Sequence, residues 1–340
     1  MRTFRGLAAA VAAMAVVAVA GCTDSGDSGG DSASGELTKV TYLTAFNTFG
    51  REGYAYVAKE KGFFEEVGLD VDIQVGTGSG ENMAALQSGA ADFAPVDSTG
   101  YMLTKANGKT EGITAVAAVQ QRSMVGIMTL DDKGITTPKD LEGKKLGDQN
   151  GATTSILFPL YAKLAGFDDK KVTIVPTEAG ALGPALGQGR VDAIGQFVVG
   201  QPLIEKAAGG GTRKAVSLPF SDVITDLYGH FLLTSDKIAN ENPEMAQKFA
   251  TALLKGMDYS INNPKESADI LAKAVPETDV EVAAAEMVIM KTYTIGDAPK
   301  LGVVDADRVA KVIAILEGAG SIPAGKTPAD FVKIDLAPKA

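Results

Sequence analysis

Several residue types are almost missing from this chain of 340 residues. It contains one cysteine, one histidine and no tryptophan. A single cysteine, Cys22, excludes a disulfide within the chain and leaves no thiol pair for metal or redox chemistry. A single histidine, His230, cannot build a usual zinc site without cysteine partners. We therefore expect no metal site, and nothing in the sequence calls for a cofactor.

Positive charge is also scarce. The chain has 32 basic and 42 acidic residues, which gives a net charge of −10. Removing residues 1–21 takes away two arginines and no acidic residue, so the remainder carries −12. A protein that binds nucleic acid needs a basic face, and an acidic chain is repelled by an anionic membrane surface. Nucleic acid is therefore excluded as a partner.

The N-terminus has the pattern of a secretory signal. Arg2 and Arg5 precede an apolar run of 14 residues, from Leu7 to Ala20, which is too short to span a bilayer comfortably. The small residues that follow, in the string VAGC ending at Cys22, resemble the signal of bacterial lipoproteins. This resemblance implies lipidation of Cys22 and an extracytoplasmic protein anchored to the cell membrane, because two acyl chains bind a bilayer firmly. The alternative is an ordinary signal peptide in which Cys22 occurs by chance.

Beyond the signal, composition predicts a linker and then two domains. Residues 22–36 are small, polar and acidic after Cys22 and predict a flexible linker. The 319 residues after the signal suffice for two domains of ordinary size. From Leu37 onward, short apolar runs alternate with amphipathic stretches and glycine-rich turns, which is typical of βαβ units on a parallel sheet.

The predicted elements fall into three groups. We expect strands near 38–44, 69–75, 91–96 and 113–119 with helices near 51–60, 79–88 and 98–107. A second set has strands near 125–130, 144–147, 172–176, 192–197 and 214–218 and helices near 152–165, 179–187 and 200–208. The remainder is predicted to be helical near 243–262, 264–274, 278–293 and 305–318 and to return to the first set.

An internal repeat relates the two sets. Residues 77–92, TGSGENMAALQSGAAD, agree with residues 177–192, TEAGALGPALGQGRVD, at six positions with a constant offset of 100. Gly89 and Gly189 are expected to end helices, and Asp92 and Asp192 to introduce the next strands. These residues favour a structural role. The repeat therefore predicts two similar open α/β lobes, and ligands of such sheets lie beyond the carboxyl ends of the strands.

The chain resembles a known family over most of residues 38–235. The characteristic strings are YVAKEKGFFEEVGLDV at 56–71 and LEGKKLG at 141–147, supported by AALQSGAADFA at 84–94. They are similar to solute-binding proteins of ABC importers for alkanesulfonates, nitrate, taurine and the pyrimidine precursor of thiamine. The resemblance implies a periplasmic-binding-protein-like α/β fold with two doubly wound lobes, a hinge and a ligand crevice between them. We expect residues 37–122 and 231–340 in lobe one and residues 123–230 in lobe two.

Candidate ligand contacts follow from strand ends and helix starts, where free backbone N–H groups and hydroxyls can bind a polar group. The candidates in the first lobe are Phe46, Asn47, Phe49, Arg51, Glu52, Gly78, Ser79, Gly80, Asp97, Ser98 and Thr99. Those in the second lobe are Gly151, Thr153, Thr154, Gln196, Phe197 and Tyr228. Plain helix capping is the competing interpretation. For His230, near a predicted hinge, a hydrogen-bonded structural role is favoured over a ligand contact.

The resemblance implies a role in import, with an ABC permease and ATPase as partners and a monomeric receptor. Flat rings beside carboxylates such as Glu52 and Asp97 would suit an aminopyrimidine, which favours a heteroaromatic solute such as a thiamine pyrimidine precursor. In that branch of the family a Trp-Phe-Pro-Asn-like segment follows the first strand, whereas here the segment reads Ala45-Phe46-Asn47-Thr48. A sulfonate, taurine or nitrate-like anion stays open, as does a sensory surface lipoprotein without transport. A related fold makes the thiamine pyrimidine with a cysteine-rich segment, which this chain lacks, so we expect no enzyme.

Overall fold

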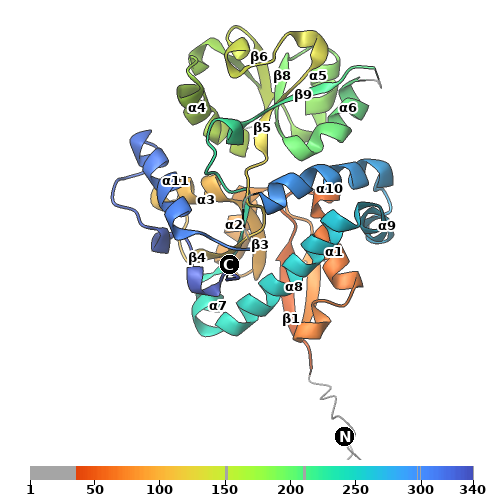
Figure 1. Cartoon of the computed structure of the whole chain (residues 1–340), viewed down its shortest axis with the longest axis vertical. Helices are drawn as coiled ribbons and strands as arrows, with labels where there is room; N and C mark the ends of the chain where they lie inside the picture. The colour runs from red at the N-terminus through yellow and green to blue at the C-terminus, as the bar shows by residue number, and fades with distance from the viewer. Residues whose placement is uncertain (1–35, 150–151, 210–211, 297, 299, 340) are drawn as a thin grey trace, which may run out of the picture. The chain divides into compact units, whose positions relative to one another are not determined.

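Two five-stranded sheets organise the protein, as a computed structural model shows for residues 36–339 except 150–151, 210–211, 297 and 299 (Figure 1). The first sheet has the order β2-β1-β3-β10-β4 and the second the order β7-β6-β8-β5-β9. The strands of the first sheet are β1 (Thr38–Leu43), β2 (Leu69–Gln74), β3 (Phe93–Asp97), β4 (Ile113–Ala118) and β10 (His230–Ser235). Those of the second are β5 (Val125–Leu130), β6 (Lys145–Asp148), β7 (Thr173–Pro176), β8 (Ala193–Phe197) and β9 (Ala215–Pro219).

Helices connect the strands of each sheet and continue after β10. The first sheet carries α1 (Gly53–Glu60), α2 (Ser79–Ser88) and α3 (Ser98–Ala106), and the second α4 (Thr153–Ala165), α5 (Leu182–Gly187) and α6 (Gln201–Gly209). The C-terminal helices are α7 (Asp236–Glu241), α8 (Pro243–Asn262), α9 (Pro264–Ala274), α10 (Val280–Ile295) and α11 (Ala306–Gly318). Among the described residues, no helix combines the length and apolar character that crossing a bilayer requires. The predicted elements are confirmed to within a few residues, and β10 and α7 are additional.

Both sheets are mixed, so the expectation of parallel sheets is wrong for one strand in each. β10 runs antiparallel to β3 and β4, and β5 runs antiparallel to β8 and β9. Each of these strands enters its sheet directly from a segment that links the two sheets. Parallel pairing needs a crossover connection, usually a helix, and neither strand has one in front of it. In each sheet order the antiparallel strand is the fourth, β10 in the first sheet and β5 in the second.

The internal repeat has matching contacts in both sheets. Asp92 Oδ2 accepts a hydrogen bond from the backbone N–H of Thr41 at 2.8 Å, and Asp192 Oδ2 accepts one from the backbone N–H of Lys145 at 2.9 Å. The backbone carbonyls of these aspartates accept hydrogen bonds from the hydroxyls of Thr234 and Thr129. The structural interpretation of the repeat is thus confirmed, because each aspartate joins the start of one strand to its neighbour.

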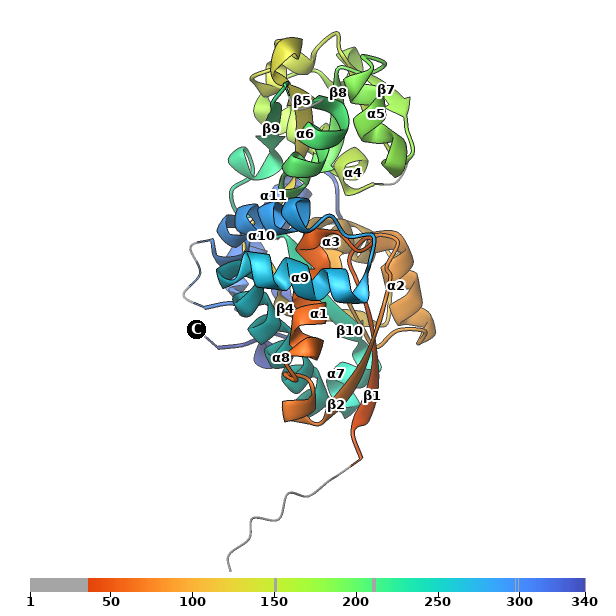
Figure 2. The same cartoon turned by 90° about the vertical axis from the view of Figure 1, so that its right-hand side faces the viewer.

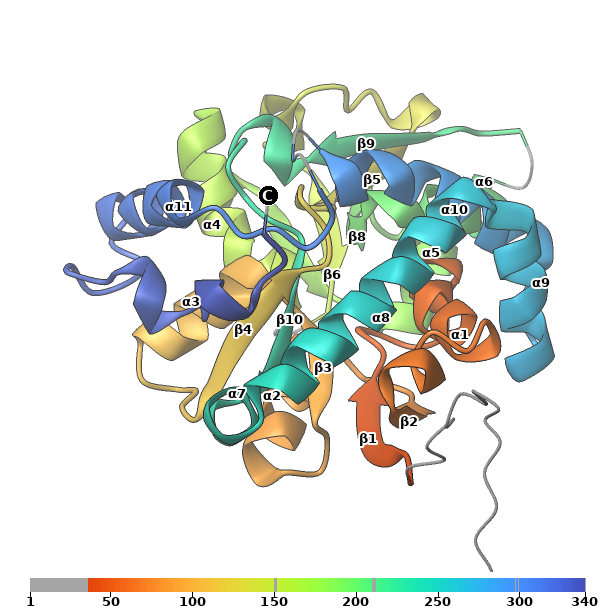
Figure 3. The ribbon, with the colours of Figure 1, turned by 60° about the horizontal axis from the view of Figure 1, so that its bottom comes forward.

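Among the C-terminal helices, α7 and α8 pack against strands of the first sheet. Phe249 of α8 stacks on Phe93 of β3, with ring centroids 4.1 Å apart and planes 5° apart, and also stacks on Phe64. Figure 3 shows α8 crossing the first sheet, and Figure 2 shows α1, α9 and α10 side by side. Residues 36–340 form one compact unit.

Two neighbouring segments link the sheets. The N–H of Gly229 donates to the carbonyl of Gln120, and the backbone N–H of His230 donates to Gln120 Oε1 at 2.7 Å. His230 pairs with Asp97 in the first sheet, although the predicted lobe boundary assigns it to lobe two. The other predicted boundaries between lobe one and lobe two stay a prediction.

Candidate functional site

Two buried charged residues, Arg51 and Glu52, lie at the start of α1. Phe49 precedes a 3-10 turn, η1 (Gly50–Glu52), which leads directly into α1. This turn packs against α10 so closely that a Cβ on Gly50 would lie 2.4 Å from Ala283 Cα, so only glycine fits there. Arg51 and Glu52 are consequently 4% and 2% exposed, although both are charged residue types.

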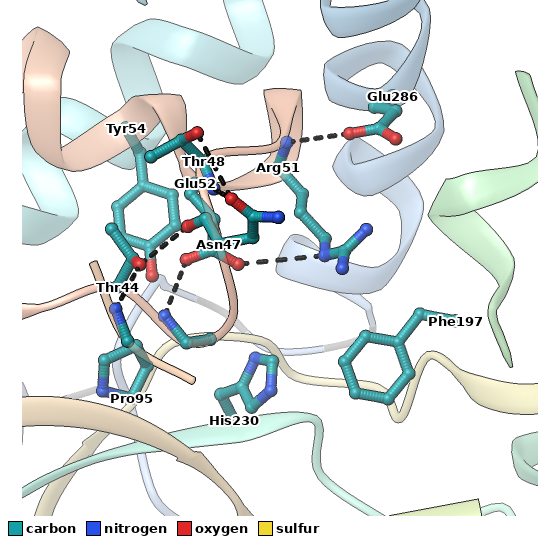
Figure 4. A network of polar contacts seen from close by, with 12 residues as sticks. Thr44, Asn47, Thr48, Arg51, Glu52, Tyr54, Pro95, Phe197, His230 and Glu286 are labelled. Atoms are coloured by element: carbon teal, nitrogen blue, oxygen red, sulfur yellow. Dashed lines mark hydrogen bonds and ion pairs between the residues drawn. The ribbon is translucent and has the colours of Figure 1, made fainter. Parts of the chain in front are cut away.

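Arg51 lies near the carboxyl groups of Glu52 and Glu286 and the ring of Phe197 (Figure 4), and it also contacts the ring of Phe49. Its Nε is 3.7 Å from Glu52 Oε1, and its backbone N–H donates to Glu286 Oε2 at 3.2 Å. The guanidinium carbon is 4.5 Å from the ring centroid of Phe49 and 5.5 Å from that of Phe197. Phe49 lies between β1 and η1, and Phe197 ends β8 of the second sheet, so this arginine joins residues of both lobes by cation–π contact.

His230 extends the group on the side of Phe197. The two rings meet edge to face with centroids 5.5 Å apart. The side chain of His230 is buried, and burial together with the charge of Arg51 lowers its pKa from 6.5 to about 3. The imidazole is therefore neutral at physiological pH. Figure 4 shows the side chain of Arg51 extending from beside Glu286 toward the rings of His230 and Phe197.

Three buried polar atoms of this group have no hydrogen-bond partner in the described part of the chain. They are Arg51 Nε, Glu286 Oε1 and His230 Nδ1. A buried polar atom left unpaired costs about 1–3 kcal/mol, so native proteins seldom leave several together. Such a group is typical of a site at which a ligand supplies the missing partners.

Burial also changes the ionisation of the carboxyl groups. Desolvation raises the pKa of Glu52 from 4.5 to about 7, against the attraction of Arg51 and a hydrogen bond from the Ala45 N–H. Desolvation likewise raises the pKa of Asp97 to about 7 and that of Glu286 above its ordinary value. Near neutral pH the group therefore contains the positive charge of Arg51 and carboxyl groups whose raised pKa favours the protonated form.

The second lobe contributes a smaller polar group at the end of β6. Asp148 Oδ2 accepts hydrogen bonds from the hydroxyls of Thr154 at 2.5 Å and Ser155 at 2.7 Å. Gly195 makes room for it, because a Cβ there would lie 2.4 Å from Asp148 Oδ1. Thr154 is thus engaged within its own lobe.

The structure brings together only part of the predicted set. Phe49, Arg51, Glu52 and Phe197 form the group described above, and Asp97 is linked to it by pairing with His230. Phe46 lies beside Phe49, with ring centroids 6.1 Å apart. The ring of Tyr228 packs instead under Arg308, and its hydroxyl accepts from the Asp305 N–H, so the structure places it away from the group.

The other predicted residues have local partners. Ser79 Oγ accepts from the Asp97 N–H, Ser98 Oγ donates to the Tyr228 carbonyl, Asn47 Oδ1 accepts from the Thr48 N–H, and Gln196 Oε1 accepts from the Phe197 N–H. Thr99 is buried with an unpaired hydroxyl, Gly78 and Gly80 begin α2, and Thr153 begins α4. Gly151, Cys22, the signal at 1–21 and the linker up to residue 35 lie outside the described residues.

Sequence reasoning missed Glu286 and favoured a structural role for His230. Glu286 stands alone among apolar residues in the predicted helix, in the string VAAAEMVIM, and such an isolated acid was the available signal. His230 was expected to be held by hydrogen bonds, and this is true of its backbone but not of Nδ1. Among the described residues, no cluster of three His, Cys, Asp or Glu side chains could hold a metal ion.

The two lobes, each a mixed sheet with helices, define the protein as a member of the periplasmic-binding-protein fold class. The fold matches the crystal structure of the periplasmic aliphatic sulphonate binding protein SsuA from Escherichia coli with a TM-score of 0.65. That match has 18% identity and covers 89% of this chain and 92% of the other. Residues 53–267 match the NMT1/THI5 like family, and the chain belongs to this family.

Two relatives illustrate the range of the family. The formylaminopyrimidine-binding protein of Halalkalibacterium halodurans is 25% identical over 219 residues, which cover 64% of this chain and 65% of that protein. A protein of Saccharomyces cerevisiae named 4-amino-5-hydroxymethyl-2-methylpyrimidine phosphate synthase is 26% identical over 222 residues, which cover 62% of this chain and 63% of that one. The matched part of the chain thus spans less than two thirds of either relative.

Proposed function

We propose that the protein is the extracytoplasmic solute receptor of an ABC importer and binds a small heteroaromatic solute at the Arg51 group. The observation that carries this proposal is the set of unpaired buried atoms on Arg51, Glu286 and His230, beside the rings of Phe49 and Phe197. A planar solute with hydrogen-bonding groups on its edge would satisfy these atoms and contact the rings.

Charge favours a neutral solute over an anion. Glu52 Oε1 lies 3.7 Å from Arg51 Nε, Glu286 interacts with the same positive charge, and the neutral His230 adds no positive charge. An anion would have to displace a carboxylate or bind beside one in a buried environment, which is unfavourable. The relative named for formylaminopyrimidine agrees with this preference. The alternative, a sulfonate, taurine or nitrate-like anion, depends on Arg51 Nε, which donates no hydrogen bond in the described chain, and has a fold relative named for aliphatic sulphonates.

A thermal-shift panel on the chain from residue 23 onward tests the choice of solute. We expect aminopyrimidines to raise the melting temperature, because a ligand that binds only the native state stabilises it by RT ln(1 + [L]/Kd). Taurine, methanesulfonate and nitrate are expected to leave it unchanged. Stabilisation by the anions alone would replace the heteroaromatic solute with an anionic one.

Transport and anchoring are tested in cells. Deletion of the gene is expected to abolish uptake of the solute that the panel identifies, whereas unchanged uptake would favour a sensory lipoprotein. A Cys22→Ala variant is expected to be released from the membrane, because the thiol is the proposed site of lipidation. The permease, the ATPase, the monomeric state and the lack of catalysis belong to the same proposal. Turnover of a bound pyrimidine by the purified protein would contradict it.

A further inference from the structure

Glu286 is a buried carboxyl with one oxygen used and one unused. It lies in α10 and is 1% exposed, among the buried residues Ala283, Met287 and Met290 of the same helix. Oε2 accepts the backbone N–H of Arg51, whereas Oε1 has no hydrogen-bond partner in the described chain. A carboxyl group is rarely buried in an apolar helix face without full pairing, because the lost hydration is not replaced.

Packing alone does not explain this residue. A methionine or leucine would fill the same space without the desolvation penalty, as Met287 and Met290 do nearby. The contact to the Arg51 N–H needs only one acceptor oxygen. The backbone N–H groups of Arg51 and Gly50 both favour the ionised carboxyl, and of the two only the bond from Arg51 to Oε2 has hydrogen-bond geometry. Oε1 therefore keeps an acceptor position that no hydrogen bond of the described chain fills.

The neighbouring groups define the chemistry of that partner. Arg51 Nε makes an ion pair with Glu52 Oε1 at 3.7 Å but donates no hydrogen bond, and Glu286 Oε1 accepts none when the carboxyl is ionised. The other titratable groups that couple to them are Glu52, whose Oε2 is already used by the Ala45 N–H, and the neutral His230. A solute that satisfies both atoms must carry an N–H donor and a separate acceptor, as the amino group and ring nitrogen of an aminopyrimidine do.

We propose that Glu286 is a specificity-determining residue of the solute site, whose Oε1 accepts a hydrogen bond from an N–H of the solute while Arg51 Nε donates to an acceptor on it. The inference rests on the proposed function and deepens it. Both residues lie outside the family match at 53–267.

The substitution Glu286→Gln offers a selective test because it replaces an accepting carboxylate oxygen with a donating amide NH₂ group of nearly the same size. The Arg51 N–H requires an acceptor, so the amide oxygen of glutamine takes the place of Oε2. The amide NH₂ then takes the place of Oε1 and presents a donor where the wild type presents an acceptor. A solute with a carbonyl at that position should now be preferred over one with an amino group.

Calorimetric titration with three probes measures this preference. They are 4-amino-5-hydroxymethyl-2-methylpyrimidine, its 4-oxo analogue and the analogue with hydrogen at position 4. For the wild type we expect the amino compound to bind about tenfold or more tightly than either analogue, because sites built to pair a polar group reject analogues that lack it. For E286Q we expect the order of the amino and oxo compounds to reverse. The exposed Glu281 of the same helix provides the control variant E281Q, which should keep the wild-type order.

The outcomes separate the inference from the proposed function. If E286Q binds the three probes in the wild-type order, the role of Glu286 is overturned while solute binding stands. If the wild type binds none of the probes and none of the anions, the proposed function fails and the inference fails with it. Should E286Q not fold, the wild-type ranking decides alone, since equal binding of the amino and 4-hydrogen compounds contradicts a hydrogen bond to Oε1.

Discussion

The backbone N–H of Arg51 donates a 3.2 Å hydrogen bond to the carboxylate of Glu286, 235 residues further along the chain. The bond fixes η1, at the entrance of α1, to the middle of α10. Because Gly50 is in van der Waals contact with Ala283 of the same helix, the turn has little freedom to move. The position of the Arg51 side chain between Phe49 and Phe197 thus depends on a C-terminal helix.

Glu52 is expected to make the protein less stable as pH rises from about 5 to 7. Its pKa is about 7 in the folded chain and 4.5 ordinarily, so the native state holds a proton that the unfolded state has lost in this range. The free energy of unfolding then falls by up to about 1.4 kcal/mol per pH unit for this group. Asp97 acts in the same direction, whereas His230, with a lowered pKa, acts in the opposite direction between about pH 3 and 6.5.

Urea unfolding of Glu52→Gln between pH 5 and 8 checks this prediction. The variant should lose part of the decline with pH, because it has no proton to release at this position. The exposed Glu111→Gln variant serves as the control and should follow the wild type. A decline that is equal in all three proteins would contradict the assignment to Glu52.

Gly256→Ala in α8 is expected to destabilise the protein by roughly 1–3 kcal/mol through overpacking. A Cβ at this position would lie 2.4 Å from the Tyr54 carbonyl oxygen and 2.6 Å from Ala58 Cβ, where α8 crosses α1. The intrinsic helix preference of alanine, about 1 kcal/mol, acts in the other direction and is smaller than a severe clash.

Gly318→Ala is the matched control for this change. Gly318 ends α11, and a Cβ there has no neighbour within 4 Å among the described residues. Its substitution should leave the urea midpoint unchanged or slightly raise it. An equal effect of the two substitutions would show that the crossing of α1 and α8 adapts to the extra methyl group.

Lys206→Glu is expected to speed release of the solute without a large change in the melting temperature. Lys206 of α6 forms an ion pair with Asp279, the N-cap residue of α10, and so connects the second lobe to a helix that packs on the first. Exposed pairs contribute little to global stability, but reversal of this charge places two negative groups at a contact between the lobes. We expect a several-fold faster dissociation in stopped-flow measurements at low salt.

High salt and a second variant provide the controls. The difference between K206E and the wild type should shrink at 1 M salt, where the Debye length is about 3 Å. Lys214→Glu breaks the Lys214–Glu205 pair, which lies within the second lobe, and should leave dissociation unchanged. If K206E and K214E behave alike, the ion pair of α6 and α10 has no special role in holding the solute.

The sequence by itself determined the local elements. The helix predicted at 243–262 is observed as Pro243–Asn262, because Pro243 and Pro264 mark helix starts through the fixed φ of proline. Likewise Gly89 and Gly189 adopt positive φ near 70°, which ends a helix and is available to glycine at no steric cost. Such signals act within a few residues, so they can be recognised without knowledge of the rest of the chain.

Only the tertiary structure decided the direction of β5 and β10 and the composition of the Arg51 group. Strand direction depends on how the chain enters a sheet formed by distant segments, and burial of a carboxyl such as Glu286 depends on which surface its helix covers. Phe197, Arg51 and Glu286 belong to three segments that carry no local mark of their proximity. The site therefore arises from long-range packing, in which each residue acquires its ionisation and its unpaired atoms from neighbours far away in the sequence.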